Sequence, residues 1–280
     1  MQVVLQNVNK RFQRDGSQPL TVLQDINLNI ERGEFISLLG PSGCGKSTIL
    51  NIVAGLETAS DGIVTVNGQP IKGPGTDRIV VFQESGLFPW MNVLDNVTYG
   101  LLLKGMSKKE AHEKAMEGLR MVHLTRFAKS FPHELSGGMK QRVAIARAFV
   151  MDPEILLMDE PFAALDEQTR MVLHEELQTI WQKTGKTIIF ITHNIREAVM
   201  LSTRIILMGT RPGIIKKEFT VEAARPRDLS DSVLRHLEAR LLQGLEQEME
   251  KVLKEEMGDD YSYKKGAVLS DPMHNLGSDI

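Results

Sequence analysis

The sequence predicts an α/β protein with a parallel core sheet, an antiparallel β subdomain, an α-helical insert and a C-terminal helix. Three observations predict this class. Two runs that alternate apolar and polar residues open the chain, apolar strand-like runs alternate with helical stretches further on, and a long helical pattern interrupts them. Together they indicate a sheet-based core with a helical layer inserted into it.

The composition is that of a globular protein of 280 residues, 42% hydrophobic, long enough for one large domain or two unequal ones. No apolar run reaches about 18 residues and no charged start precedes an apolar core, so we expect neither a membrane span nor a signal peptide, and a cytoplasmic chain. The single cysteine, Cys44, cannot form an internal disulfide; a small loop residue is favoured there over a reactive thiol. The net charge of −3 gives no electrostatic reason to expect a nucleic-acid partner.

The first elements are two alternating runs, residues 3–12 and 21–30, with a turn between them, which predicts an antiparallel pair. Residues 34–40 form an apolar run that leads into a glycine loop. The following stretch, 46–56, reads as a helix closed by Gly55. This is a strand, loop and helix unit.

Two further strands are predicted before the pattern turns helical from about Val93 to Val150, with Ser107 as a helix cap. Strands resume after this insert and are separated by helical stretches, which predicts that they join a parallel sheet. The later strand runs are 154–160, 186–193, 204–209 and 213–219. From Pro226 onward no strand signal remains.

The glycine loop, GPSGCGKST, has the spacing G-x-x-x-x-G-K-S/T between a strand and a helix, which predicts a nucleotide-phosphate site over a structural glycine turn. Its backbone N–H groups can face the β-phosphate, Lys46 can reach the β and γ oxygens, and Ser47 offers a hydroxyl to Mg²⁺. The residues of this loop are Gly40, Pro41, Ser42, Gly43, Cys44, Gly45, Lys46, Ser47 and Thr48.

Two adjacent carboxylates, Asp159 and Glu160, end the apolar strand ILLMDE. Adjacent strand residues point in opposite directions, so the two can have different tasks. We expect Asp159 to hold Mg²⁺ through water and Glu160 to polarise the water that attacks the γ-phosphate. The alternative, two solvated carboxylates after a strand, is disfavoured because the run before them is so apolar.

The motifs GPSGCGKST, LSGGMKQR, ILLMDEP, ALD and ITH, in this order, resemble the ATPase subunit of an ABC transporter over roughly residues 1–220. The resemblance implies a P-loop NTPase core, the cofactors ATP and Mg²⁺, and four further sites. These are Gln83 as a sensor of Mg²⁺ and water, Ser136, Gly137 and Gly138 as the signature, Asp166 in an inter-subunit loop, and His193 on the γ-phosphate. Taken alone, His193 would more often be a satisfied core or strand-end histidine.

The domain division that follows is an ABC ATPase cassette at 1–225 with the helical insert at about 84–150, a helical extension at 226–257 and a flexible tail at 258–280.

The signature presents a second anion-binding helix start, at Ser136, although the chain already has a phosphate loop. The helical insert separates the two, so we expect the signature to serve the ATP of another subunit. In the family two cassettes pack head to tail, which implies a second copy of the chain or a homologous ATPase as partner. Binding of ATP would close this pair and hydrolysis would open it.

Two aromatic features point to ligands. Phe12 occupies the position where the family stacks a ring on adenine; the alternative is a strand-end core residue. The cluster Leu87, Phe88, Trp90 and Met91 marks a partner surface, which in the family receives a membrane-spanning permease subunit. For Trp90 alone, core packing is an equal alternative.

Three stretches, FPW at 88–90, the signature helix and GTRPGIIKKEF followed by ARPRD, resemble the importer branch for nitrate, sulfonate, taurine or bicarbonate, with an indirect solute-binding protein as partner. This places the chain at the inner face of the cell membrane. Because such an ATPase does not touch the solute, the sequence does not select among these anions.

The C-terminal region places apolar residues at four-residue intervals, which predicts one helix with an apolar side. These residues are Val233, Leu237, Leu241, Leu245, Met249 and Leu253. The helix either packs on its own sheet or pairs with its twin or acts in regulation. No metal-ligand spacing appears in the tail.

Two other functions are less consistent with the sequence. A soluble ABC ATPase acting on translation or DNA usually carries two cassettes or a long coiled coil, and neither is present. A regulatory module that only binds ATP would not need Glu160 and His193, and both are intact.

Overall fold

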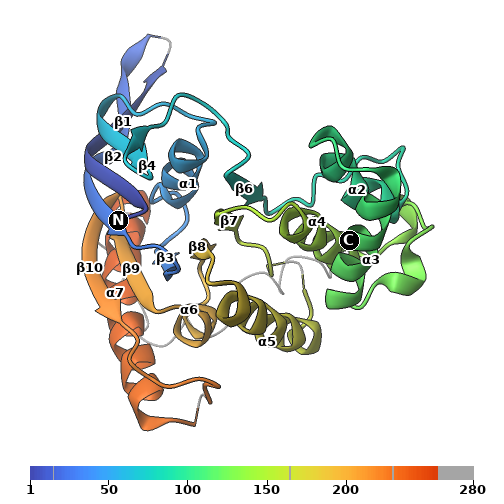
Figure 1. Ribbon diagram of the computed structural model, residues 1–280. Coiled ribbons are helices and arrows are strands. Elements are labelled where there is room, and N and C mark those ends of the chain that lie inside the picture. The colour runs from blue at the N-terminus through green and yellow to red at the C-terminus, as the bar shows by residue number, and fades with distance from the viewer. Residues whose placement is uncertain (15, 164, 229, 258–280) are drawn as a thin grey trace, which may run out of the picture.

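The computed structural model describes residues 1–257 apart from residues 15, 164 and 229. The predicted tail at 258–280 lies outside the described residues. The described chain forms two sheets, a group of helices beside them and a long C-terminal helix (Figure 1). The expected α/β class is confirmed.

The core sheet has six strands in the order β10-β9-β3-β8-β7-β6. Five are parallel: β3 (Phe35–Leu39), β6 (Arg78–Val81), β7 (Ile155–Asp159), β8 (Thr187–Thr192) and β9 (Arg204–Gly209). The prediction of parallel pairing after the insert is confirmed for β7, β8 and β9. The prediction that the last strand is parallel too is wrong, because β10 (Ile214–Thr220) runs antiparallel to β9. Only residues 210–213 join these strands, too few for the crossover that parallel pairing requires.

The smaller sheet is antiparallel, with the order β2-β1-β4-β5, which confirms the expected antiparallel opening. Its strands are β1 (Val3–Arg14), β2 (Ser17–Ile30), β4 (Asp61–Val66) and β5 (Gln69–Pro70). Alternate residues of β1 and β2 are buried in one apolar cluster with the helix α1 (Lys46–Ala54) and with core-sheet strands. This packing holds the glycine loop between the two sheets.

The helical insert contains α2 (Val93–Leu103), α3 (Lys108–Met121) and α4 (Gly137–Val150), with short 3₁₀ turns at Thr125–Phe127 and Pro132–Glu134. It stands away from the β subdomain, beyond β6 and β7 (Figure 1). Ser107 caps α3 as predicted and forms a reciprocal capping box with Glu110. The chain returns from α4 directly into β7, so the insert is anchored at the edge of the core sheet.

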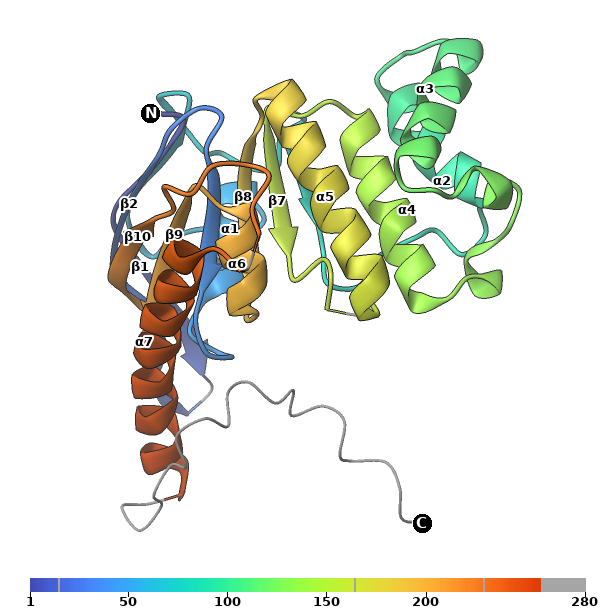
Figure 2. The same ribbon diagram turned by 90° about the horizontal axis from the view of Figure 1, so that it is seen from below.

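The remaining helices are α5 (Glu167–Thr184), α6 (Ile195–Leu201) and α7 (Ser232–Met257). Figure 2 shows α7 lying along β9 and β10. Leu237, Leu241 and Leu245 are buried with residues of α6, β9 and β10, so the helix packs on its own sheet. The predicted apolar side starts at the wrong residue: Val233 is 56% exposed whereas Leu234 is fully buried. A four-residue interval drifts from the 3.6-residue helical period, which explains the shift.

Within the described part of the chain, no helix is both long enough and apolar enough to cross a membrane.

Candidate nucleotide-binding site

The glycine loop lies between the end of β3 and the start of α1. Gly43 and Gly45 have φ of +76° and +91°, the left-handed region that favours glycine. A Cβ on Gly45 would also lie 2.5 Å from a methyl carbon of Leu23. The loop needs glycine here for its backbone conformation and for its contact with the β subdomain.

Lys46 folds back over its own loop. Its Nζ donates to the carbonyl oxygens of Gly40 and Pro41, each at 2.8 Å, and the residue is 6% exposed. The ammonium group is therefore held where the loop curls. Cys44 is fully buried beneath it and burial raises the pKa of its thiol, which supports the small loop residue over the reactive thiol.

The predicted Mg²⁺ ligands Ser47 and Asp159 lie near each other at the end of β7, close enough for the Ser47 hydroxyl to lower the pKa of the carboxylate. Burial raises the pKa of Asp159 and the neighbouring charge of Glu160 adds to this, while the Ser47 hydroxyl and Lys46 oppose it. A hydroxyl and a carboxylate side by side are oxygen donors of the kind that Mg²⁺ prefers. The two groups come from motifs more than a hundred residues apart.

Glu160 has a strained backbone, with φ of +44°, and its N–H donates to the carbonyl of Ile191 at 3.0 Å. Such strain persists only where surrounding structure imposes it, and it is concentrated at functional sites. The Glu160 carboxylate lies beside His193, at the end of β8. The two adjacent carboxylates thus have different partners, as expected.

His193 follows β8 and meets Glu160, with 3.0 Å between His193 Nδ1 and Glu160 Oε2. The His193 side chain is 58% exposed, so the alternative of a core histidine is wrong, although the residue does stand at a strand end. The hydrogen bond from His193 lowers the pKa of Glu160, and the same bond raises the pKa of His193 against the effect of burial. Each group favours the charged form of the other.

Gln83 lies just beyond β6 and is exposed. Val81, the last residue of β6, is in register with Met158 of β7, so Gln83 follows the end of β6 as Glu160 follows the end of β7. A residue that sequence reasoning missed fixes this segment: Gln141 of α4 is buried and donates to the carbonyl of Phe82 at 2.9 Å. A lone glutamine within an apolar helix face was the available signal.

The signature residues lie apart from this group. Ser136 caps α4, its hydroxyl accepting from the N–H of Met139 at 3.3 Å, and both Ser136 and Gly137 are exposed. A Cβ placed on Gly137 would meet no atom within 4 Å. In both ribbon views α4 stands away from α1, which follows the glycine loop (Figures 1 and 2).

Asp166 is exposed and caps α5, its carboxylate accepting from the N–H of Thr169 at 2.9 Å. That hydrogen bond lowers the pKa of Asp166. The preceding carbonyl, of Leu165, accepts from Arg170 at 2.9 Å. The loop is thus fixed from the side of α5.

The comparisons with known proteins agree with this geometry. Residues 23–163 match the ABC transporter family. The chain is 48% identical to an uncharacterized ABC transporter ATP-binding protein of Methanocaldococcus jannaschii. The match extends over 250 residues, which are 89% of this chain and 93% of the relative. The chain belongs to the ABC transporter family.

The names of other relatives of this ABC cassette state the solute that is imported. It is 50% identical to a nitrate import ATP-binding protein of Synechocystis over 72% of the chain and 76% of the relative. The chain is also 43% identical to an aliphatic sulfonates import ATP-binding protein of Bacillus thuringiensis over 88% of its own length and 96% of the relative. The expected resemblance to this branch is confirmed.

A solved structure supports the fold of the cassette. It is a dimeric ATP-binding cassette in a post-hydrolysis state, bound to ADP and phosphate, 36% identical, with a TM-score of 0.73 over 79% of this chain and 100% of that one. The protein described here is accordingly an ATP-binding, ATP-hydrolysing subunit coupled to transport, which excludes the purely regulatory alternative.

The two aromatic residues predicted to meet ligands, Phe12 and Trp90, lie at the surface. Phe12 is 38% exposed with Lys10 Nζ 4.6 Å from its ring centre, so it is not a core residue. Trp90 is 70% exposed, and its ring contacts Phe88, which also packs against Tyr99. Core packing of Trp90 is therefore wrong.

The loop that carries Trp90 is rigidly held by two residues that sequence reasoning missed. The Asn96 side chain bonds the backbone N–H of Phe88 and its carbonyl, at 2.8 and 3.1 Å. Arg147 donates to the carbonyls of Ser85 and Gly86, both at 2.9 Å. The exposed ring is thus presented on a fixed backbone.

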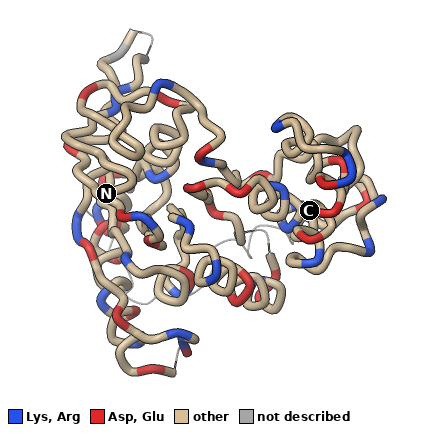
Figure 3. Tube along the Cα trace, in the orientation of Figure 1, with Lys and Arg blue, Asp and Glu red and all other residues tan. Residues whose placement is uncertain are grey.

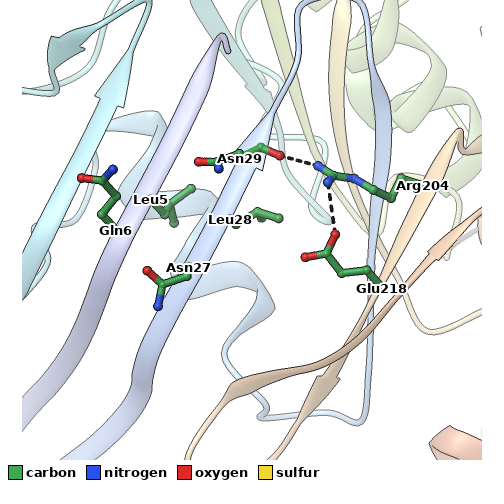
Figure 4. Close-up of a pocket in the computed structure, with 7 residues that line it drawn as sticks. All are labelled: Leu5, Gln6, Asn27, Leu28, Asn29, Arg204 and Glu218. Atoms are coloured by element: carbon green, nitrogen blue, oxygen red, sulfur yellow. Dashed lines mark hydrogen bonds and ion pairs between the residues drawn. The ribbon is translucent and has the colours of Figure 1, made fainter.

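The cassette has a separate polar recess of about 390 Å³ between the two sheets (Figure 4). Arg204 on its wall is in register with Ile36, at the edge of the core sheet opposite the glycine loop, and is already paired with Glu218 and Glu34. Figure 3 shows acidic and basic residues interspersed over the described chain. The chain's charge distribution therefore does not mark the nucleotide site. The site is recognised by the side chains that lie together at the end of β7 and β8.

Proposed function

We propose that this chain powers the import of a small anion of the nitrate, sulfonate or taurine class by ATP-driven closure of a head-to-tail pair. One observation carries the proposal. The carboxylate, imidazole and phosphate-loop groups gather at one edge of the core sheet, while the signature helix start is exposed and distant from them. The named activities of the nitrate and sulfonate relatives support the solute class.

The phosphate-binding half of the site belongs to one chain. Backbone N–H groups of residues 40–48 face the β-phosphate, and Lys46 leaves its two carbonyl partners for phosphate oxygens. Ser47 and Asp159 would hold Mg²⁺, with Gln83 at the same edge. When bound, the ion would supply positive charge to offset the charge that develops on the phosphate oxygens.

The chemical step uses Glu160 and His193. Glu160, ionised because His193 donates to it, accepts hydrogen bonding from the attacking water and polarises it. His193 is exposed enough for its remaining ring nitrogen to reach the γ-phosphate. Their hydrogen bond fixes both groups before the substrate arrives.

A second copy, or a homologous ATPase, completes the site. The start of α4, with Ser136 to Gly138, binds the γ-phosphate held by the partner's glycine loop through backbone N–H groups. Asp166 lies at the same interface. Loss of the γ-phosphate removes contacts that both chains share, and the pair opens.

The exposed loop at Leu87–Met91 docks on a membrane-spanning permease, which places the chain at the inner face of the membrane. A solute-binding protein is an indirect partner, because it meets the permease and not this chain.

Phe12 stacks on adenine. Co-purification with a membrane subunit would distinguish this transporter subunit from the ABC ATPase that acts on translation or DNA.

The test is uptake of labelled nitrate, taurine and an alkanesulfonate by cells whose only copy carries Glu160→Gln. Uptake of one anion should be lost while that of the others persists through their own transporters. Glu175→Gln, which changes an exposed carboxylate of α5, is the matched control. Unchanged uptake of all three anions would contradict the proposed solute class.

A further inference from the structure

A buried charged cluster lies behind the strand end that carries His193, and the roles above do not use it. Its centre is Glu197, in the first turn of α6 and 5% exposed. Glu197 Oε2 accepts from the Thr192 hydroxyl at 2.6 Å. Glu197 Oε1 lies 3.6 Å from both Arg170 Nε and His174 Nε2. A carboxylate so deeply buried is tolerated only with such partners.

One side of the cluster controls the backbone of His193. The Thr192 hydroxyl donates to Glu197 and accepts from the N–H of Asn194 at 2.9 Å, so the residues before and after His193 are fixed by one group. The charge of Glu197 also contributes, after that of Glu160, to the raised pKa of His193. Glu197 thus acts on His193 through the chain and through its field.

The other side controls the loop that ends at Asp166. Arg170 donates to the carbonyl of Leu165 at 2.9 Å and to Glu167 at 3.0 Å, both next to Asp166 in sequence. Movement of that loop therefore moves the Arg170 guanidinium, which faces Glu197.

The contact between the two sides is incomplete. Arg170 Nε and His174 Nε2 are buried and have no hydrogen-bond partner among the described residues. Glu197 Oε1 faces both from just outside hydrogen-bond distance. A shift of a few tenths of an ångström in either side would complete these hydrogen bonds.

We propose that Glu197 is a positioning residue that couples the Asp166 loop to His193, so that arrival of a partner at the loop sets the histidine for catalysis. The inference rests on the proposed function, because Asp166 meets a partner only in the head-to-tail pair. Glu197 itself touches neither ATP nor water in this scheme.

The experiment measures kcat and KM for ATP of the full chain with Glu197→Gln, Arg170→Gln and both changes together. Glu197→Gln keeps the size of the side chain and an oxygen for Thr192, and loses only the charge. Each single change should lower kcat about 10-fold with KM nearly unchanged, because the phosphate loop is intact. The double variant should be no slower than either single one, since both break one coupling.

Glu238→Gln is the matched control. It breaks an ion pair of 3.3 Å between Glu238 of α7 and Arg196 of α6, the helix that also carries Glu197, and should leave kcat unchanged. Thermal unfolding of every variant confirms that it is folded. If Glu197→Gln does not fold, Thr192→Val serves instead, because it removes only the hydroxyl between Glu197 and the backbone of His193.

A folded Glu197→Gln with wild-type kcat would overturn the inference, as would a double variant whose loss is the product of the single losses. Failure of the proposed function looks different. In that case wild-type turnover per chain would not rise with protein concentration, whatever Glu197 does.

Discussion

The edge of the core sheet at the glycine loop and the start of α4 are both suited to bind an anion, yet they differ in what surrounds them. At the sheet edge Lys46 and Glu160 are each held by partners within the chain, and Asp159 lies close to both. At α4, Ser136 and Gly137 are exposed, and the space beside Gly137 is open. The start of α4 is therefore an anion-binding helix start that its own chain leaves open, so a second molecule can bind there.

The comparison is tested most strongly by Gly137→Asp. A new carboxylate at this helix start should repel the γ-phosphate and lower turnover by about 10²–10³, the scale of losing one transition-state donor. Affinity of the single chain for ATP should be unchanged, because the glycine loop is not altered. ATPase assays and fluorescent-nucleotide titration measure the two quantities.

Gly73→Asp is the control for that variant, since a Cβ at Gly73 also meets no atom within 4 Å but lies in the β5–β6 connection. Equal loss of turnover in both variants would show that the added charge, and not its place, is responsible.

Lys46→Ala alters the other region and should have the reverse effect. Loss of a charge-assisted contact to phosphate should weaken binding of ATP by the single chain about 10–10²-fold. Lys72→Ala changes an exposed lysine outside the loop and should bind normally. Undiminished binding by Lys46→Ala would remove the distinction between the two regions.

The smallest expected effect concerns the ion pair between His193 and Glu160 at the sheet edge. The pKa of His193 is raised by Glu160 and that of Glu160 is lowered by His193, so the ion pair stabilises the fold between the two pKa values. This contribution is complete below the unfolded pKa of His193 and is lost as pH rises through the folded one. It also disappears as pH falls through the folded pKa of Glu160.

NMR titration should therefore place the His193 pKa above the usual value of about 6.5 in wild type and nearer to it in Glu160→Gln. An unchanged His193 pKa in that variant would mean that the pair does not form in solution.

Sequence reasoning reached the groups whose chemistry is written in local spacing. Lys46, Ser47, Asp159 and Glu160 each stand in a short motif beside a strand, and the structure brings them to one edge. The parallel strands followed from the alternation with helices. Sequence patterns sufficed for these elements because each strand and helix shows its own hydrophobic periodicity within a short stretch of the chain.

What it did not reach depends on contacts between distant segments. Gln141 and Arg147 hold the segment after β6 from a helix about sixty residues further on, and Glu197 resembles any glutamate of an amphipathic helix until its burial is known. The two errors in the fold were local: the short connection before β10 requires antiparallel pairing, and a four-residue interval drifts from the 3.6-residue period of α7.

The most direct measurement mixes two inactive full-length variants, Lys46→Ala and Gly137→Asp. In a head-to-tail pair, a mixed dimer has one site with an intact glycine loop and an intact signature. The mixture should therefore regain ATPase activity, at about a quarter of the wild-type rate for random pairing. A mixture as inactive as its two components would contradict the claim that each site is built from two chains.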